Sequence, residues 1–204
     1  ASFVHFVQNH DQVANCGLGQ RLHQISHPGA YRAMTALLLL SPQTPMLFQG
    51  QEFAASSRFV FFADHDGELA SAVRAGRLEF LKQFPSLTNP DMQKRLPDPN
   101  QLRSFESCRL DFLESERHRE VYILHRDLLT LRRTDPVIKM QRAGAVDGAV
   151  LANNVFVLRF FAEDGDDRLL LVNFGLDCSL TRVPEPLLAS PSGFNWRLLW
   201  SSDD

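Results

Sequence analysis

The stretch Phe6-Val7-Gln8-Asn9-His10-Asp11-Gln12 joins the end of an apolar run to a cluster of polar side chains. Residues 2–8 are rich in β-branched and aromatic side chains, which favours a short buried strand. In a parallel barrel the carboxyl ends of the strands form the active face, so polar groups placed there are typical of catalysis or ligand binding. The alternative is a loop in which Asn9 and Asp11 cap backbone groups.

The residues that follow predict a βαβ unit. Residues 9–26 are expected to form a polar, glycine-bearing loop, and Pro28 stands where the first turn of a helix tolerates proline. Residues 29–40 are apolar nearly all round, which is typical of a helix packed on both sides. After two prolines, residues 46–48 predict a second short strand. Strand, helix and strand in this order indicate a parallel sheet.

The pattern changes along the remainder of the chain. Residues 68–84 predict a helix, residues 85–107 a loop, and residues 116–134 an amphipathic helix that ends at Asp135-Pro136. Strand-like stretches follow at residues 155–161, 168–174 and 196–200. The sequence therefore predicts an α/β plus all-β fold, with a first domain at 1–135 and an antiparallel β-domain at 136–204.

The composition is that of an ordinary globular protein, 44% hydrophobic and 22% charged. A net charge of -3 gives no support to nucleic-acid binding, which usually comes with a basic surplus. The longest apolar run, residues 36–40, is far below the ~20 residues of a membrane span. The three widely spaced cysteines support neither a zinc site nor a disulfide framework, and they predict a reducing, cytoplasmic setting.

The first residue is Ala1 instead of Met, which predicts a truncated or processed start, and no signal peptide is visible. Asp64-His65-Asp66 could suggest a metal site, but adjacent residues rarely point at one ion, so a solvated loop or a sugar contact is favoured. Arg74 and Arg77 are expected as charges on a helix surface, with closure over a substrate as the alternative. We expect no metal and no cofactor.

Two motifs carry a resemblance to a known family. Residues 6–11 match F-x-x-N-H-D, and residues 49–53 contain a G-x-E motif after the second predicted strand. These motifs resemble the fourth conserved region and the eighth-strand signature of the α-amylase family of glycoside hydrolases. The resemblance implies that residues 1–135 are the carboxy-terminal part of a (β/α)8 catalytic barrel, with strands seven and eight. Residues 136–204 would then be a sandwich-like β-domain.

Longer matches narrow the resemblance to the malto-oligosyltrehalose trehalohydrolases, which cleave the α-1,4 bond beside a terminal trehalose unit. These matches lie at residues 6–13, 19–22, 36–42, 61–65 and 96–99. The resemblance implies a retaining hydrolase acting on malto-oligosyltrehalose or a related α-glucan. Another α-glucan enzyme, such as a branching enzyme or an α-amylase, and a non-catalytic carbohydrate-binding or assembly module are the alternatives.

The resemblance also implies a role for each polar residue of the two motifs. Asp11 matches a carboxylate that holds sugar hydroxyls and stabilises the oxocarbenium-like transition state, and His10 matches a histidine that binds the same sugar. Hydrogen bonds to a sugar 2-OH can strengthen in the transition state. Substrate contacts are also expected from Asn9, Gln12 and Glu52, with a structural carboxylate as the alternative for Glu52. The nucleophile and general acid of the family are expected before Ala1.

Two positions depart from the resemblance. Close relatives tend to carry arginine where this chain has Cys16, and an acidic residue where it has Gln51. The first departure concerns the shape of the loop after Asp11. The second concerns the middle position of the G-x-E motif, which tolerates variety in the broader family.

Overall fold

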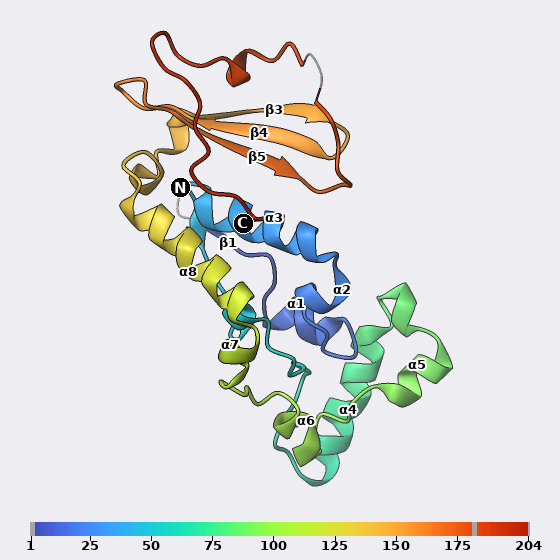
Figure 1. The fold of residues 1–204 in the computed structure, drawn as a ribbon. Helices are drawn as coiled ribbons and strands as arrows, with labels where there is room; N and C mark the ends of the chain where they lie inside the picture. Colours follow the sequence, from blue (N-terminus) through green and yellow to red (C-terminus); the bar gives the residue numbers. More distant parts are fainter. Residues whose placement is uncertain (1–2, 181–182, 204) are drawn as a thin grey trace. The chain divides into compact units, whose positions relative to one another are not determined.

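The computed structural model describes residues 3–180 and 183–203. Residues 1, 2 and 204, at which the predicted domains and the first predicted strand begin or end, lie outside the described residues. The chain divides into two compact units, which we describe separately (Figure 1). One unit gathers the residues up to Val7, Ser26–Met46 and the chain from Glu120 onward, and the other gathers Gln8–Ile25 and Leu47–Arg119.

The first unit contains a parallel pair of short strands. Strand β1 (Val4–His5) pairs with β2 (Thr44–Pro45), and helix α3 (Pro28–Leu40) lies between them in the sequence. This confirms the predicted order of strand, helix and parallel strand. The positions were partly wrong: β1 is shorter and more exposed than predicted, and β2 precedes residues 46–48, since Phe48 takes part in a turn closed by Gln51.

Helix α3 begins and ends with specific contacts. The ring Nδ1 of His27 accepts a hydrogen bond from the backbone N–H of Gly29 at 3.2 Å, and Pro28 occupies the first helical turn. At the other end, the guanidinium of Arg132 donates to the carbonyl oxygens of Leu39, Ser41 and Gln43, at 2.7, 2.6 and 2.7 Å. Arg132 belongs to helix α8 (Arg119–Thr134), so α8 fixes the chain where α3 leads into β2.

The predicted helix over 116–134 is two helices in the structure. Helix α7 (Glu114–Arg117) ends at His118, whose backbone leaves the helical region at φ -105° and ψ 39°. The ring Nδ1 of His118 lies 3.0 Å from the carbonyl oxygen of Phe53, a contact of the second unit that the periodicity does not reveal. Helix α8 then continues to Thr134, as predicted.

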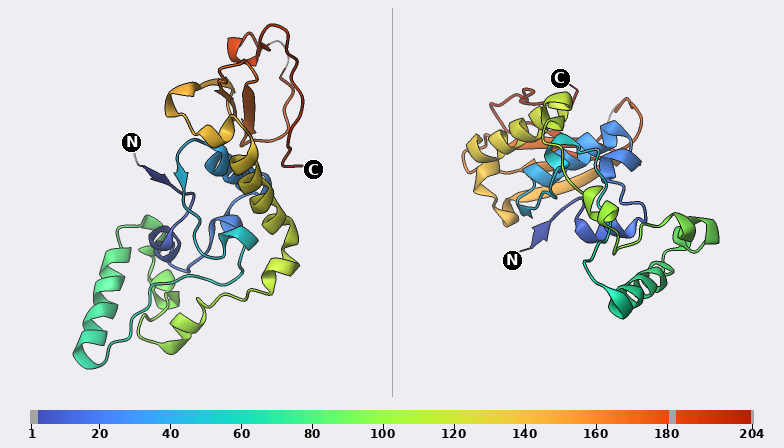
Figure 2. Two further views of the ribbon diagram at one scale, coloured as in Figure 1. Left: turned by 90° about the vertical axis from the view of Figure 1, so that its left-hand side faces the viewer. Right: turned by 90° about the horizontal axis from the view of Figure 1, so that it is seen from below.

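A three-stranded antiparallel sheet completes the first unit, with strands in the order β3 (Val146–Ala152), β4 (Val155–Phe160) and β5 (Arg168–Asn173). Strands β4 and β5 confirm two of the predicted stretches, and β3 was not predicted because its small residues give a weak strand signal. The strand predicted at 196–200 is wrong: these residues have no regular structure, and the indole N–H of Trp196 donates to the carbonyl of Leu188. Helix α3 packs against β5 (Figures 1 and 2).

Arginines connect this sheet to its surroundings. Arg168 of β5 donates to a carboxylate oxygen of Asp135 at 2.8 Å, directly after the end of α8. Arg159 of β4 forms a buried ion pair with Asp167 at 2.8 Å. The predicted division at Asp135-Pro136 therefore falls at a residue that bonds to the sheet, and the division remains a prediction.

The second unit is built from short helices and turns. Its helices are α1 (His10–Asn15), α2 (Leu22–Ile25), α4 (Gly67–Leu81), α5 (Pro90–Arg95), α6 (Leu102–Glu106) and α7, with 3₁₀ turns η1 (Gln51–Phe53) and η2 (Pro85–Leu87). The helix predicted over 68–84 is α4. The loops predicted at 9–26 and 85–107 are wrong in part, because Asn9 and Asn89 accept hydrogen bonds as helix N-caps and start α1 and α5.

None of the helices in the described part of the chain is both long and apolar enough to cross a membrane. In the same residues, histidine, cysteine and carboxylate side chains nowhere gather in threes as a metal site requires.

Candidate functional site

The polar cluster after β1 begins with a buried glutamine. Gln8 is 2% exposed, and its side-chain carbonyl oxygen accepts a hydrogen bond from the backbone N–H of Leu22 at 2.9 Å. This contact fixes the start of the cluster to the start of α2. The next residue, Asn9, has an extended backbone, and its side-chain oxygen accepts from the N–H of Gln12 at 2.9 Å. Asn9 thereby turns the chain into α1.

His10 and Asp11 occupy the first turn of α1 and are open to solvent. Their side chains are 68% and 72% exposed, and the His10 Nε2 and Asp11 Oδ1 atoms lie 3.6 Å apart. The capping hydrogen bond of α1 is accepted by Asn9, so the structure assigns the cap to Asn9 and leaves the Asp11 carboxylate on the surface. A carboxylate in this turn is stabilised by the positive end of the helix dipole. The exposed pair can accept and donate hydrogen bonds to a polyhydroxylated ligand.

The far end of α1 is held by Arg77 of α4. The guanidinium donates to the side-chain oxygen of Asn15 at 2.7 Å and to the carbonyl oxygen of Ala14 at 3.0 Å. Burial lowers the pKa of Arg77, and the negative charge of Asp11 raises it. Because Arg77 is half-buried and bonded to α1, the expectation of a plain surface charge is wrong for this residue.

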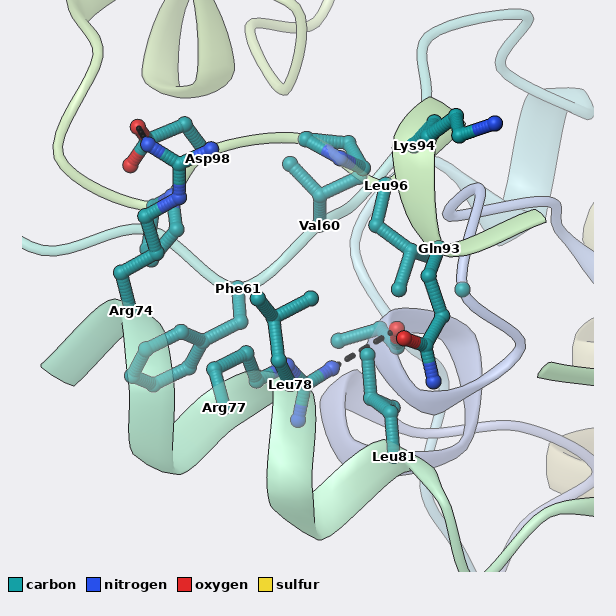
Figure 3. Close-up of a pocket in the computed structure, with 14 residues that line it drawn as sticks. Val60, Phe61, Arg74, Arg77, Leu78, Leu81, Gln93, Lys94, Leu96 and Asp98 are labelled. Atoms are coloured by element: carbon teal, nitrogen blue, oxygen red, sulfur yellow. Dashed lines mark hydrogen bonds and ion pairs between the residues drawn. The ribbon is translucent and has the colours of Figure 1, made fainter. Parts of the chain in front are cut away.

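A small cavity of about 80 Å³ opens beside Arg77. Figure 3 shows Arg74, Arg77, Leu78 and Leu81 projecting from α4 toward Val60, Leu96 and Asp98. Arg74 is 60% exposed and pairs with Asp98 at 3.0 Å, as expected for a surface charge.

Glu52 lies in η1, on a different segment of the same unit. Its turn is bounded by two residues in the left-handed region, Gly50 at φ 78° and Ala54 at φ 49°. The fully buried Arg21 donates to the carbonyl oxygens of Gln49 and Ser57, at 2.6 and 2.7 Å, and so closes the two ends of the loop. Glu52 itself is half-buried, and its assignment as a substrate contact stays a prediction.

A second contact fixes the same loop. Glu114 is buried and accepts hydrogen bonds from the backbone N–H and the hydroxyl of Ser56. Burial alone would raise the pKa of Glu114, but the hydrogen bonds from Ser56 and the charges of His118 and Arg117 lower it overall. Nearby, burial and the charges of Arg21 and His118 lower the pKa of His23 from 6.5 to about 4.

The two departures from the resemblance have structural roles. The Cys16 sulfur accepts a hydrogen bond from the N–H of Gln20 at 3.0 Å and lies 3.0 Å from the carbonyl oxygen of Val13, so Cys16 shapes the turn after α1. Gln51 is fully buried, and its side-chain oxygen accepts from the N–H of Phe48 at 3.3 Å. Neither side chain projects freely from its loop.

The structure brings Asn9, His10, Asp11 and Gln12 together at the start of α1. The sequence predicted Arg77 as a surface charge and predicted no role for Arg21 and Glu114. In the structure these three side chains hold segments of the unit together. Sequence position alone gave no signal for Glu114. The sequence did hold a signal for the two arginines. Arg21 lies within the matched stretch 19–22, and Arg77 follows Arg74 by about one helical turn, so the two side chains lie on one face of the predicted helix.

Several curated proteins that are similar to this chain carry the same name. A malto-oligosyltrehalose trehalohydrolase of Deinococcus radiodurans is 41% identical over 179 residues, which is 86% of this chain and 29% of that protein. The corresponding protein of Rhizobium sp. (strain M-11) is 36% identical over 74% of this chain and 24% of its own length. A protein of the same name from Mycobacterium tuberculosis is 38% identical over 62% of this chain and 21% of its own.

A solved structure and a family model also match this chain. A crystal structure from Salmonella typhimurium, whose name assigns it to the alpha amylases, matches with a TM-score of 0.71 and 32% identity, over 85% of this chain and 29% of that one. The family described as "Domain of unknown function (DUF3459)" matches residues 143–204. The chain spans less than a third of the length of the curated relatives, 29% of the first. Over most of its length, this chain is similar in sequence to the carboxy-terminal portion of the malto-oligosyltrehalose trehalohydrolases.

Proposed function

We propose that this chain is part of a retaining glycoside hydrolase that cleaves the α-1,4 bond next to the trehalose unit of malto-oligosyltrehalose and releases trehalose. The similarity to proteins of that name supports the reaction. The observation that carries the proposal is the exposed Asp11 carboxylate in the first turn of α1, the first helix that follows strand β1 of the parallel pair in the sequence. Polar groups at this position of a parallel barrel serve catalysis.

In this proposal Asp11 stabilises the transition state. Its carboxylate accepts hydrogen bonds from sugar hydroxyls while positive charge develops at the ring, and His10 binds the same sugar. Asn9, Gln12 and Glu52 contribute further contacts to the α-glucan. A nucleophile and a general acid about 5–5.5 Å apart are also required for retention, and the remainder of a full-length protein would supply them.

The domain assignment belongs to the same proposal. Residues 1–135 would form strands seven and eight of a (β/α)8 barrel with their helices, and residues 136–204 a sandwich-like β-domain. The parallel pair β1 and β2 with α3 between them in sequence, and the antiparallel sheet of β3, β4 and β5, support this division. We place the protein in the cytoplasm, with the α-glucan as its partner, without nucleic acid or membrane and without a cofactor.

Trehalose release by the complete protein tests the proposal. The purified full-length protein is incubated with maltotriosyltrehalose and, separately, with an unmodified malto-oligosaccharide of the same number of glucose units. We expect free trehalose from the first and little hydrolysis of the second. Equal hydrolysis of both would favour an α-amylase, and binding without hydrolysis would favour a carbohydrate-binding module; either result would exclude the trehalohydrolase.

A further inference from the structure

The side chain of Arg77 makes hydrogen bonds and cation–π contacts that a solvated surface charge would lack. Its guanidinium donates to the Asn15 side chain and to the carbonyl oxygen of Ala14, the last two residues of α1. The same group lies over the rings of Phe61 and Phe80, 5.2 and 5.5 Å from their centroids. Hydrogen bonds fix the direction of a guanidinium, and aromatic faces hold its plane. Arg77 is therefore a rigid support for the end of α1.

The position of α1 depends on such a support. The helix has six residues, too short to be stable by its own hydrogen bonds, so its orientation comes from contacts with the rest of the unit. The Asn9 cap fixes its start, and Arg77 fixes its end. Asn15 follows Asp11 by four residues, so both side chains lie on one face of the helix. A shift of the helix end at Asn15 therefore moves the Asp11 carboxylate.

Charge strengthens this coupling. Burial lowers the pKa of Arg77, and the negative charge of Asp11 opposes this shift, so the two groups attract each other. Arg74, one turn earlier in α4, has different surroundings, since it pairs with Asp98 and is 60% exposed. Among these two arginines, only Arg77 is bonded to α1 in the described part of the chain.

We propose that Arg77 is a positioning residue that holds α1 so that the Asp11 carboxylate meets the reacting sugar in the transition state. This inference rests on the proposed function of Asp11 and adds to it a residue outside the sequence motif. Arg77 does not itself contact substrate in this proposal; it acts through α1 and Asp11. Misplacing a catalytic group by about 1 Å can lower a rate about 100-fold.

The test uses the full-length protein with maltotriosyltrehalose. Arg77→Gln removes the charge and one of the two donors, and Arg77→Lys keeps the charge but loses the paired geometry. We expect kcat to fall about 10- to 100-fold in Arg77→Gln, and less in Arg77→Lys, with KM little changed, because the lost interaction acts in the transition state. Lys82→Gln, an exposed position at the end of α4, is the matched control and should keep kcat.

A double-mutant cycle separates positioning from general stability. If Arg77 acts through Asp11, then Arg77→Gln should lower kcat little further once Asp11→Asn is present. A merely structural role would lower the melting temperature and would reduce kcat by the same factor in both backgrounds. Additive effects, or a kcat of Arg77→Gln equal to that of Lys82→Gln, would overturn the assignment of Arg77 while trehalose release by the parent protein stands. A parent protein that releases no trehalose overturns the proposed function and this inference with it.

Discussion

Asn9 and Asp11 lie two residues apart, and the structure gives them different surroundings. Asn9 is half-buried and caps α1, whereas the Asp11 side chain is 72% exposed. By its sequence, either residue could cap a helix. Only the backbone conformation decides which one does, and therefore whether the Asp11 carboxylate is used as a cap or is left open to a ligand. The surface position of Asp11 allows its charge to be removed without leaving a cavity.

We therefore expect Asp11→Asn in the full-length protein to lower kcat by several orders of magnitude and to leave the melting temperature nearly unchanged. The variant loses an acceptor that binds sugar hydroxyls more tightly as the transition state forms, and such differential binding appears in kcat. Steady-state kinetics and thermal unfolding of the same preparation measure both effects. Asp91→Asn, which changes an exposed carboxylate of α5, is the control. Normal turnover in a destabilised protein would contradict the catalytic role.

We expect His23 to make the stability of the protein sensitive to acid. Burial, with the charges of Arg21 and His118, lowers its pKa in the folded protein to about 4, from an ordinary value of 6.5. Between these two pH values the unfolded chain binds the proton more readily than the folded chain, so the free energy of unfolding falls as the pH decreases through this window. Well above pH 6.5 the histidine is neutral in both states and contributes no pH dependence.

We expect His23→Gln to reduce the loss of melting temperature between pH 7 and pH 4.5, compared with the parent protein. The reason is that the variant has no imidazole to protonate in the unfolded state. Thermal unfolding at a series of pH values measures the difference, and His65→Gln, at an exposed position, should behave like the parent. An identical pH dependence in His23→Gln and the parent would show that another group controls the acid sensitivity.

At the scale of elements, arginines that donate to backbone carbonyl oxygens fix two junctions of this chain, the end of α3 and the η1 loop. Arg132 of α8 binds three carbonyl oxygens where α3 ends, and Arg21 binds two at the ends of the η1 loop. Carbonyl groups that lie inside a protein must be hydrogen-bonded or they cost free energy. Each guanidinium satisfies several of them at once and fixes a junction between elements.

Arg132→Met should weaken the end of α3. We expect the local free energy of opening to fall by about 3 kcal/mol, because three charged hydrogen bonds are lost and the carbonyl group of Leu39 remains buried. Native-state hydrogen exchange of the α3 amides measures this opening. The neighbouring Arg133 is exposed, so Arg133→Met should leave the exchange unchanged. Equal protection in both variants would mean that the Arg132 contacts do not stabilise the junction.

At the scale of the whole molecule, this chain spans less than a third of the length of its curated relatives, 29% of the first. The proposal assigns one carboxylate of the reaction, Asp11, to this chain. Strands β1 and β2 are two residues each, and a complete (β/α)8 barrel of about 250 residues would pair such strands on both sides. Unpaired strand edges invite association with other chains.

We expect the isolated 204-residue chain to release no trehalose from maltotriosyltrehalose and to self-associate. One carboxylate cannot replace a nucleophile and a general acid, and unpaired edges can join between copies. An end-point trehalose assay and size-exclusion chromatography at several concentrations test the two statements. Trehalose release by a pure sample would contradict the first, and a monomer that persists on dilution and concentration would contradict the second.

The sequence by itself was sufficient for the features that depend on local pattern. Apolar residues nearly all round predicted α3, strand-like runs predicted β4 and β5, and the N-H-D motif pointed to the similarity with the malto-oligosyltrehalose trehalohydrolases. The short helices α1 and α5 could also have been predicted, since each begins with an asparagine in a favourable capping position. Such features are encoded within a few residues of one another.

Only the tertiary structure decided the rest, because it depends on contacts between distant residues. The ends of β1 and β2 are set by their pairing, and the break between α7 and α8 by His118 beside Phe53. The hydrogen bond from Arg77 to Asn15 joins residues that are 62 positions apart in the sequence, so no local pattern encodes it. The sequence thus pointed to the residues that are proposed to carry the chemistry, while long-range hydrogen bonds determined where α1, and with it Asp11, is held.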